Sequence, residues 1–516
     1  MSPRISIVTP VYNPPLWALE ACISSVLTQT EKDWQWCIAD DQSTDPGVRS
    51  RLLKLAKAEP RVNLTLRDTN GGIVEASNSA LATATGEFVA LLDHDDSLTP
   101  DALAKVLDTF ALAGDVDYVY SDEDKIDREG HLFDEFRKPS FAPERLRGQN
   151  YCCHISAFRR SVLDEVGGFR GGFDGSQDWD LVLRVTEKAR RVVHIPQVLY
   201  HWRVIPGSTS GELNAKPYVF EAARRAVSEH CDRLGIHADI STLPSGFVRC
   251  ARRPKTEPLV SIIIPTRGDR KRVWGVETCL PANAIRSILK RSTWTNLEII
   301  LVHDRVHQLD RDLAPLVDGE KVRVLWYDKP FDFSDKCNLG VLASHGDIVV
   351  LLNDDTEVET PEWIELLVAP LEDGDVAMTG PMTRFEDGRI QSAGHGNLNG
   401  PHNLASREES DSVGPFGEWA ISREVSGITG ACAAIPRTIY MELGGMSPAF
   451  PHSYNDVDFG FKALRAGYRM VWTPYARLWH FESLSRDPAV RREEVEMLYA
   501  RWGDQVESDN FTRTGP

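Results

Sequence analysis

The sequence predicts an α/β protein with two domains in tandem, each a mostly parallel sheet flanked by helices. Three observations predict this fold class. The chain has 516 residues, too many for one hydrophobic core, so two domains of about 250 residues are expected. The apolar runs Phe88–Leu92 and Ile348–Leu352 are typical of strands buried on both faces, as in a parallel sheet covered by helices. Short motifs of the first half also return in the second half.

These repeated motifs keep their order along the chain. Ser6–Pro10 returns as Ser261–Pro265, and Gly86–Asp93 returns as Gly346–Asn353. Two later pairs are Val166–Phe169 with Leu443–Met446, and His194–Pro196 with Trp472–Pro474. The spacing between partners grows along the chain, as a tandem duplication with later insertions predicts.

Each half is expected to begin with a strand, a loop and an amphipathic helix. In the first half these are the strand Ile5–Thr9 and the helix Leu16–Thr28, whose apolar residues have helical spacing. A second strand follows at Trp36–Ala39, and a third ends at Leu92. Ligands of such sheets bind beyond the carboxyl ends of the strands, and acidic residues stand there in both halves.

The first half is expected to end with an amphipathic helix over Pro217–Leu234. Turn-forming residues then interrupt the pattern, and we place the boundary near Arg252. The predicted domains are residues 1–251 and 252–516. A last helix, Ala489–Trp502, is expected to pack onto the second domain.

The composition is that of an ordinary globular protein, 42% hydrophobic and 26% charged. A net charge of −18 argues against wholesale nucleic-acid binding, although a metal ion could neutralise the phosphates of a bound nucleotide. Nine cysteines without a CxxC pair favour a reducing cytosolic compartment. No apolar run approaches the ~20 residues of a membrane helix. The first strand begins so close to Met1 that no signal peptide is expected. We therefore expect a cytoplasmic protein whose membrane contact, at the cytoplasmic membrane, would be peripheral.

Two acidic groups recur in each half. Asp93–Asp96 and Asn353–Asp355 follow the apolar strands, and Gln177–Asp180 and Asn455–Asp458 stand at expected helix starts. Divalent cations such as Mg²⁺ take oxygen ligands, and a carboxylate from another segment suits a general base. The pattern predicts two related active sites.

Simpler interpretations exist for each group. Asp93–Asp96 could be a solvated turn, and Asp178 could cap a helix, because acidic residues are common at both places. The recurrence of both groups favours catalysis. His201 and His480 could be structural histidines, and core packing is the default interpretation of the tryptophans, which are Trp179, Trp202 and Trp472.

Each half resembles glycosyltransferase family 2, whose members have the Rossmann-like GT-A fold of nucleotide-diphospho-sugar transferases and transfer sugars with inversion. The first half matches in Thr9–Asn13, Asp40–Asp45, Asn70–Gly72, Asp93–Asp96 and Gln177–Leu181. The stretches that resemble tandem bacterial members building surface polysaccharide or O-antigen are Tyr120–Lys125 and Tyr200–Arg203. The second-half motifs are Phe333–Asn338, Asn353–Thr356, Tyr454–Phe459 and His480–Ser483.

The resemblance implies roles for residues of the first half. Thr9 and Asp41 would contact the donor base, and Asp93 would reach the ribose or metal-bound oxygens. Asp95 would hold Mn²⁺ or Mg²⁺, and Asp178 would be the general base.

In the second half, Asn353 and Asp355 would occupy the metal-motif positions and Asp456 the base position. His480 would be a further metal or diphosphate contact. The match pairs Asp40-Asp41 with Asp304-Arg305. It would put a cation in place of the base-binding carboxylate and leave Asp304 as the donor-binding acid of this half.

The mechanism expected from these residues is metal-assisted sugar transfer. A cation on Asp95 would stabilise the leaving nucleoside diphosphate, and Asp178 would accept the proton of the acceptor hydroxyl. A single carboxylate base without a second nucleophile predicts inversion.

The leading hypothesis is a bifunctional glycosyltransferase that moves sugars from nucleotide-diphosphate donors to a growing bacterial cell-surface glycan or lipid-linked glycan. One alternative has a single catalytic domain, the other being a scaffold or acceptor-binding module. Another is a non-catalytic nucleotide- or carbohydrate-binding protein. A dinucleotide-dependent oxidoreductase is set aside because no GxGxxG follows the first strand.

Overall fold

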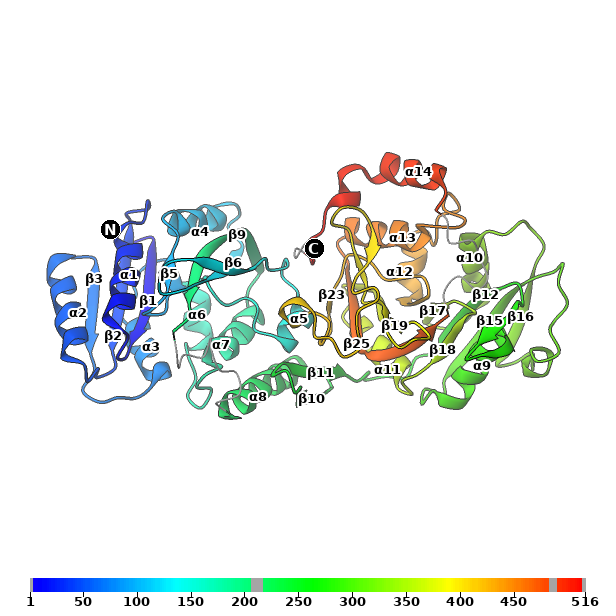
Figure 1. Ribbon diagram of the computed structural model, residues 1–516, viewed down its shortest axis with the longest axis horizontal. Helices are drawn as coiled ribbons and strands as arrows, with labels where there is room; N and C mark the ends of the chain where they lie inside the picture. The colour runs from blue at the N-terminus through cyan, green and yellow to red at the C-terminus, as the bar shows by residue number, and fades with distance from the viewer. Residues whose placement is uncertain (1–2, 206–216, 482–489, 513–516) are drawn as a thin grey trace. The chain divides into compact units, whose positions relative to one another are not determined.

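The computed structural model describes residues 3–205, 217–481 and 490–512, and it divides into two compact units (Figure 1). Unit 1 comprises Met1–Phe141, Leu146–Gly235 and Ile240–Val248. Unit 2 comprises Ala142–Arg145, Ile236–Asp239 and Arg249–Pro516. Two short segments of the first half, Ala142–Arg145 and Ile236–Asp239, thus belong to the compact unit formed by the second half. The predicted domain boundary near Arg252 stays a prediction.

Unit 1 is built on one large mixed sheet. Its strands are β1 (Ile5–Val11), β2 (Trp34–Asp40), β3 (Val62–Leu66), β4 (Phe88–Leu91), β5 (Ser97–Leu98), β6 (Val116–Ile126), β7 (Leu132–Phe136), β8 (Ser156–Arg159) and β9 (Arg191–Arg203). Its helices are α1 (Leu16–Leu27), α2 (Pro46–Ala58), α3 (Ile73–Leu81), α4 (Ala102–Ala111), α6 (Arg160–Val166), α7 (Gln177–Thr186) and α8 (Pro217–Leu234). The residues of α5 (Pro143–Gly148) are divided between the units, up to Arg145 in unit 2 and from Leu146 in unit 1. β10 (Ala238–Thr242) and β11 (Val248–Arg252) form a separate two-stranded sheet.

Unit 2 has a second large sheet. Its strands are β12 (Val260–Thr266), β15 (Leu297–Asp304), β16 (Val322–Tyr327), β17 (Ile348–Leu352), β18 (Thr356–Val358), β19 (Val376–Arg384), β20 (Ile390–Ser392), β23 (Arg423–Glu424), β24 (Cys432–Pro436) and β25 (Arg469–His480). Two small hairpin sheets are β13 (Arg270–Val273) with β14 (Val276–Cys279), and β21 (His395–Gly396) with β22 (His402–Asn403).

The helices of unit 2 lie between these strands in the sequence. They are α9 (Leu280–Arg291), α10 (Phe333–Ala343), α11 (Trp363–Leu371), α12 (Arg437–Glu442), α13 (Asn455–Arg465) and α14 (Arg492–Trp502), with short 3₁₀ turns η2 (Ala314–Leu316), η3 (Pro415–Gly417) and η4 (Gly503–Glu507). Among the described helices of the chain, none is long and apolar enough to cross a lipid bilayer.

The two sheets have the same strand order. Unit 1 runs β3-β2-β1-β4-β8-β6-β9-β5, and unit 2 runs β16-β15-β12-β17-β24-β19-β25-β18. In each, the first four strands of this order are parallel, and β8 or β24 is antiparallel to its neighbours. The predicted fold class, an α/β sheet flanked by helices in each half, is confirmed.

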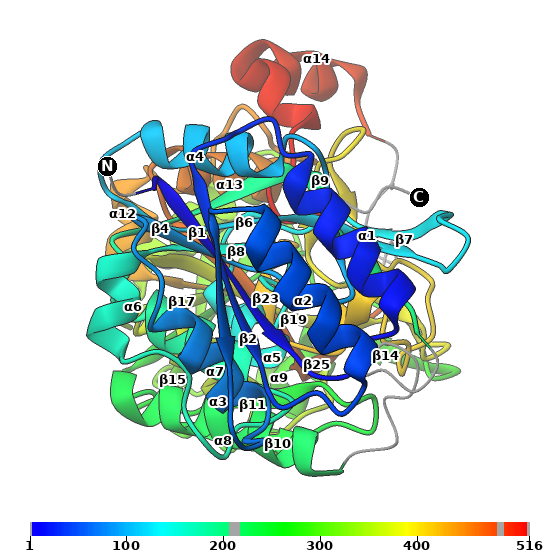
Figure 2. The same ribbon diagram turned by 90° about the vertical axis from the view of Figure 1, so that its left-hand side faces the viewer.

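Apolar residues at helical spacing join the first helix to this sheet. Leu19, Ile23 and Val26 of α1 belong to one hydrophobic cluster with Ile5 and Ile7 of β1. Figure 2 shows α1 and α2 beside these strands. The carboxyl ends of β1 and β4 are thereby held in place for the loops that follow them.

Several predicted elements agree with the structure, and one strand was missed. The helix predicted over Pro217–Leu234 has those bounds. The strand ending near Leu92 is the fourth strand, because β3 precedes it at the sheet edge. β3 escaped the sequence analysis because only Val62 among its residues is fully buried, so its apolar pattern is weak.

The last helix packs onto unit 2, as predicted. Leu498 and Trp502 of α14 share a hydrophobic cluster with Val457 and Phe461 of α13. The helix begins at Arg492, and Ala489 of the predicted span lies outside the described residues.

Two glycines mark equivalent close approaches of the backbone before β4 and β17. A Cβ on Gly86 would lie 2.8 Å from the backbone nitrogen of Ser6. One on Gly346 would lie 2.6 Å from the carbonyl oxygen of Leu259. Backbone atoms cannot rotate away, so either strand would have to shift.

We expect Gly86→Ala to destabilise unit 1 by about 1–3 kcal/mol, the usual cost of an overpacked core. Denaturant unfolding measures the change. Gly114→Ala is the matched control, because a Cβ there meets no atom within 4 Å. Equal unfolding midpoints for the two variants would contradict the prediction.

Candidate functional site

The acidic cluster of unit 1 and the start of α7 line one cavity. It has a volume of about 790 Å³, and its walls include Asp93, Asn150, His154 and Asp178. A cavity of this size suits a ligand larger than a single sugar ring. Asp95 is not among the described residues that line it; the Asp95 carboxylate lies 4.0 Å from Nε2 of His94.

Asp178 is held in the first turn of α7. Its Oδ2 accepts a hydrogen bond from Nδ2 of Asn150 at 2.9 Å, and its Oδ1 accepts one from the backbone N–H of Trp179 at 2.8 Å. Burial raises the pKa of Asp178, and nearby His154 opposes this effect. A carboxylate with a raised pKa is a better proton acceptor, so the position suits a general base.

Each expected helix start carries two aspartates, Asp178 with Asp180 and Asp456 with Asp458, and the second of each pair has a different role. Asp180 is fully buried and forms ion pairs with Arg170 and Arg184, the latter at 2.7 Å. Asp458 is also fully buried, and its Oδ1 accepts a hydrogen bond from Nε1 of Trp502 at 3.0 Å. Asp180 and Asp458 therefore stabilise the fold.

Asp93 lies beside a second carboxylate and an imidazole. The ligand atoms of Asp93, Asp96 and His154 all lie within 4.8 Å of one another. Asp96 is buried, and its carboxylate accepts hydrogen bonds from the hydroxyl of Tyr200 at 2.5 Å and the backbone N–H of Arg203 at 2.7 Å. Burial raises the pKa of Asp93 and raises that of Asp96 well above its usual range. A group of close, desolvated carboxylates is suited to a cation.

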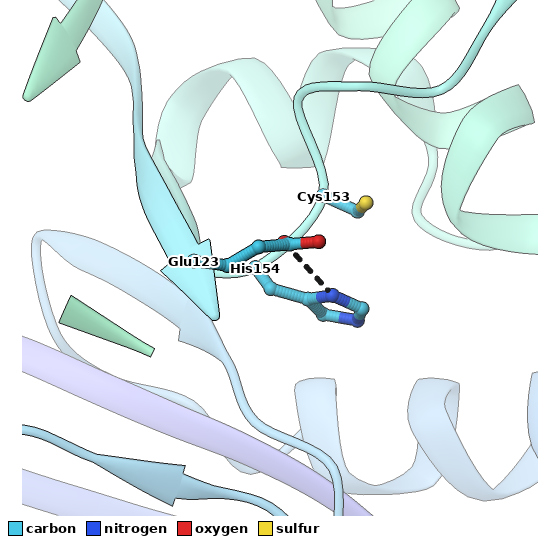
Figure 3. A group of neighbouring side chains, drawn as sticks. All are labelled: Glu123, Cys153 and His154. Carbon is cyan, nitrogen blue, oxygen red and sulfur yellow. Dashed lines mark hydrogen bonds and ion pairs between the residues drawn. The ribbon is translucent and has the colours of Figure 1, made fainter. Parts of the chain in front are cut away.

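His154 is tied to a buried ion pair. Its Nδ1 lies 3.2 Å from Oε2 of Glu123, a contact drawn as a dashed line in Figure 3. Oε2 of Glu123 accepts a hydrogen bond from Nζ of Lys138 at 2.8 Å. Burial raises the pKa of Glu123, but Lys138 and His154 outweigh burial and lower it. Burial lowers the pKa of His154, but Cys153 and Glu123 raise it well above its usual range.

The two residues predicted at the donor base are engaged inside unit 1. The hydroxyl of Thr9 accepts a hydrogen bond from Nε1 of Trp36 at 2.9 Å. The buried carboxylate of Asp41 accepts one from Nε of Arg67 at 2.7 Å and one from the N–H of Gly72 at 2.8 Å. Asp41 therefore fixes the Asn70–Gly72 loop, and its contact with a donor stays a prediction.

In unit 2 the structure brings together three predicted residues. Nε2 of His480 lies 3.1 Å from Oδ1 of Asp355 and 3.3 Å from Nδ2 of Asn353. Nδ1 of His480 lies 2.7 Å from Oε1 of Gln391. Asp456 accepts a hydrogen bond from the N–H of Gly430 at 2.7 Å, at the start of α13. Glu482 and Ser483 of the predicted motif lie outside the described residues.

The strand register corrects the expected replacement of the base-binding acid in unit 2. Ala39 pairs with Pro10, and Val302 pairs with Pro265, the proline of the repeated motif. Asp41 stands two residues after Ala39, and Asp304 stands two residues after Val302. Asp304 therefore matches Asp41. The expectation that Arg305 takes this place was wrong because the motif comparison was shifted by one residue.

Asp41 and Asp304 each form an ion pair with a buried or half-buried cationic side chain. Asp304 lies 2.5 Å from Nζ of Lys336, as Asp41 lies 2.7 Å from Nε of Arg67. The cations come from different places in the sequence, α10 in unit 2 and the end of β3 in unit 1. The arrangement of charge is therefore similar in the two units.

Sequence reasoning missed the residues that surround the predicted acids. They come from three segments of unit 1: Glu123 from β6, Lys138 from the chain after β7, and Asn150 and His154 from the loop before β8. Only Glu123 lies in a stretch that the motif comparison singled out, Tyr120–Lys125.

Comparison with known proteins supports the resemblance. The family model Glycosyl transferase family 2 matches residues 6–167 and 261–444. The chain is 38% identical over 97% of its length to the uncharacterized protein y4gI of Sinorhizobium fredii, covering 56% of that protein. It is 33% identical over 97% of its length to the O-antigen biosynthesis protein RfbC of Myxococcus xanthus, covering 39% of that protein. The chain thus spans about half or less of these relatives.

A more local match adds to these two. The chain is 32% identical to chondroitin synthase of Escherichia coli over 45% of its own length and 33% of that protein. Because the family model covers most of both halves, the chain belongs to glycosyl transferase family 2.

Proposed function

We propose that this chain is an inverting, metal-dependent glycosyltransferase that moves sugars from nucleotide-diphosphate donors to a growing bacterial cell-surface glycan, with one active site in each unit. The main support is that Asp93, after β4, and Asp178, on α7, line the same cavity. The names of the bacterial relatives, an O-antigen biosynthesis protein and a chondroitin synthase, support a glycan or lipid-linked glycan as the acceptor.

In this proposal Asp178 removes the proton of the acceptor hydroxyl. Asn150 and the N–H of Trp179 hold its two oxygens, so the carboxylate keeps one orientation in the cavity. A carboxylate held in one orientation at the wall of a cavity suits proton transfer from a hydroxyl bound there. One carboxylate base without a second nucleophile supports inversion at the anomeric carbon.

The residues at the carboxyl ends of β4 and β17 fit a divalent cation, Mn²⁺ or Mg²⁺. Asp93 and Asp95 in unit 1, and Asp355 with His480 in unit 2, offer the oxygen and imidazole donors that such ions accept. When bound, the ion would neutralise the charge that develops on the leaving diphosphate. Thr9, Asp41 and Asp304 are proposed to stand near the donor base.

We place the reaction in the cytoplasm, with peripheral contact to the cytoplasmic membrane where the acceptor is lipid-linked. None of the nine cysteines, all of which lie in the described part of the chain, forms a disulfide bond.

A second candidate has catalysis in unit 1 only. It is favoured by Asn353, which replaces Asp93 with a neutral and weaker ligand. In that case unit 2 would be a scaffold or acceptor-binding module.

Donor turnover tests the proposed function. A panel of nucleotide sugars is incubated with the chain and bacterial oligosaccharides, with Mn²⁺ or with EDTA, and nucleoside diphosphate release is measured. We expect release from at least one donor with Mn²⁺ and its loss with EDTA, and NMR should show an inverted anomeric configuration. Metal-independent binding without turnover would identify a non-catalytic binding protein, and a retained configuration would exclude inversion.

A further inference from the structure

The two units differ in the histidine that stands near the acidic residues. In unit 2, His480 at the end of β25 faces Asp355. Thr356 of β18 pairs with His480, and the repeated motif matches Thr356 to Asp96. Continuing the β5–β9 register by one residue places Trp202 opposite Asp96. Unit 1 therefore has a tryptophan where unit 2 has this histidine.

The neighbouring histidine of β9 does not take over this place. Nδ1 of His201 lies 2.6 Å from Oδ1 of Asp124, which holds the ring on the β6 side of the strand. The imidazole of His154 does approach the acidic cluster, since its ligand atom lies within 4.8 Å of those of Asp93 and Asp96. His94, inside the cluster, has its Nδ1 3.0 Å from the carbonyl oxygen of Pro10.

His154 has no counterpart in unit 2. Ala157 of β8 and Ala434 of β24 hold the same register against β4 and β17. Three residues before them stand His154 in unit 1 and Ala431 in unit 2. His154 precedes β8, whereas His480 ends β25, so the histidines that approach these acidic residues come from different places in the two units.

We propose that in unit 1 His154 joins the carboxylates of Asp93 and Asp95 as a ligand of the divalent cation, with the carboxylate of Asp96 beside them, whereas unit 2 uses His480. This inference rests on the cation of the proposed function and names a ligand at a position where the repeat of the chain has alanine. It also makes the two cation sites chemically distinct, so that each can be removed separately.

The surroundings of His154 orient its ring for this task. Glu123 lies against Nδ1, and Figure 3 shows Nε2 on the far side of the ring from Glu123. Lys138, which is fully buried, fixes Glu123. A carboxylate on one imidazole nitrogen commonly orients the other nitrogen toward a metal and makes it more basic.

A stacked ring restrains His154 from another side. The imidazole lies 4.7 Å from the ring of Tyr200 at an interplanar angle of 18°. The hydroxyl of Tyr200 donates to Asp96, so the same tyrosine positions both the histidine and the carboxylate. The cluster is therefore held in place by contacts within unit 1.

Another combination of neighbouring ligand atoms is Glu123, Cys153 and His154. Nζ of Lys138 already lies 2.8 Å from Oε2 of Glu123 and 2.7 Å from the carbonyl oxygen of His154. A metal ion there would meet this ammonium group at short range. The group formed by Asp93, Asp96 and His154 is therefore the better cation site.

The donor set also indicates the class of ion. Mg²⁺ prefers oxygen ligands and keeps several waters, whereas Mn²⁺ and later transition metals accept an imidazole nitrogen more readily. We expect unit 1 to prefer Mn²⁺ to Mg²⁺.

The test measures Mn²⁺ binding to the full chain, without nucleotide or acceptor, by calorimetry and by electron paramagnetic resonance. The wild-type chain should bind Mn²⁺ in each unit. His154→Gln should weaken Mn²⁺ binding at the unit 1 site by more than tenfold and leave binding at the unit 2 site unchanged. His480→Gln should weaken binding at the unit 2 site and leave the unit 1 site unchanged. Glu123→Gln should weaken the unit 1 site by about 10–100-fold, as loss of an orienting partner does.

His201→Gln is the matched control and should change neither site, because His201 pairs with Asp124. Thermal unfolding without metal shows whether each variant is folded. A His154→Gln chain that is folded and binds Mn²⁺ like the wild type would overturn the inference, as would a wild-type chain that binds none. Because binding is measured without donor, failure of sugar transfer would contradict the proposed function and leave this result unaffected.

Discussion

Replacing Asp178 with asparagine is expected to lower the rate of sugar transfer at unit 1 by about 10²–10⁴-fold, the usual contribution of a general base. Asparagine keeps the size of the side chain and an oxygen that accepts from Asn150 or the N–H of Trp179, so the fold should be retained. An amide cannot take the proton of the acceptor hydroxyl. The measurement is kcat for transfer, with the unfolding midpoint as the control for folding.

The same substitution at Asp456 tests unit 2. If both units are catalytic, Asp178→Asn and Asp456→Asn each abolish a different transfer step, and the product linkages identify which. If only one of the two abolishes any transfer, bifunctionality is wrong; if that one is Asp178→Asn, the second candidate function holds. The comparison is matched, because both acids lie in the first turn of a helix and accept a hydrogen bond from the next backbone N–H.

The sequence predicted the repeat and the acids at its centre because both leave local signals. The apolar runs before Asp93 and Asn353 mark buried strands, and the doublets at Asp178 and Asp456 mark helix starts. The fold then brings Asp93, beyond the carboxyl end of β4, and Asp178, in the first turn of α7, to one cavity. Motif recurrence was therefore enough to find the fold class and the candidate base.

What the sequence missed depends on pairing between distant segments. The match of Asp304 to Asp41 appears only in the register of β12 with β15, since neighbouring acids allow a shift of one residue. His154, in the loop before β8, meets Glu123 of β6, and neither residue is repeated in unit 2. Their proximity is a property of the tertiary structure.

Asp180 gives the contrasting prediction, a loss of stability. We expect Asp180→Asn to destabilise unit 1 by about 3–5 kcal/mol, the usual cost of removing one partner of a buried ion pair. The carboxylate is fully buried, and Arg184, which it holds at 2.7 Å, is itself buried. Without the Asp180 carboxylate, the buried guanidinium of Arg184 loses the negative charge that compensates for the loss of its hydration.

Denaturant unfolding of Asp180→Asn beside Asp178→Asn measures this difference. The two variants carry the same chemical change, two residues apart on the same helix. Asp178→Asn should unfold at nearly the wild-type midpoint and lose transfer, whereas Asp180→Asn should unfold much earlier. A wild-type midpoint for Asp180→Asn would mean that Arg170 and Arg184 find other partners, and the separation of structural from catalytic acids within the doublet would then fail.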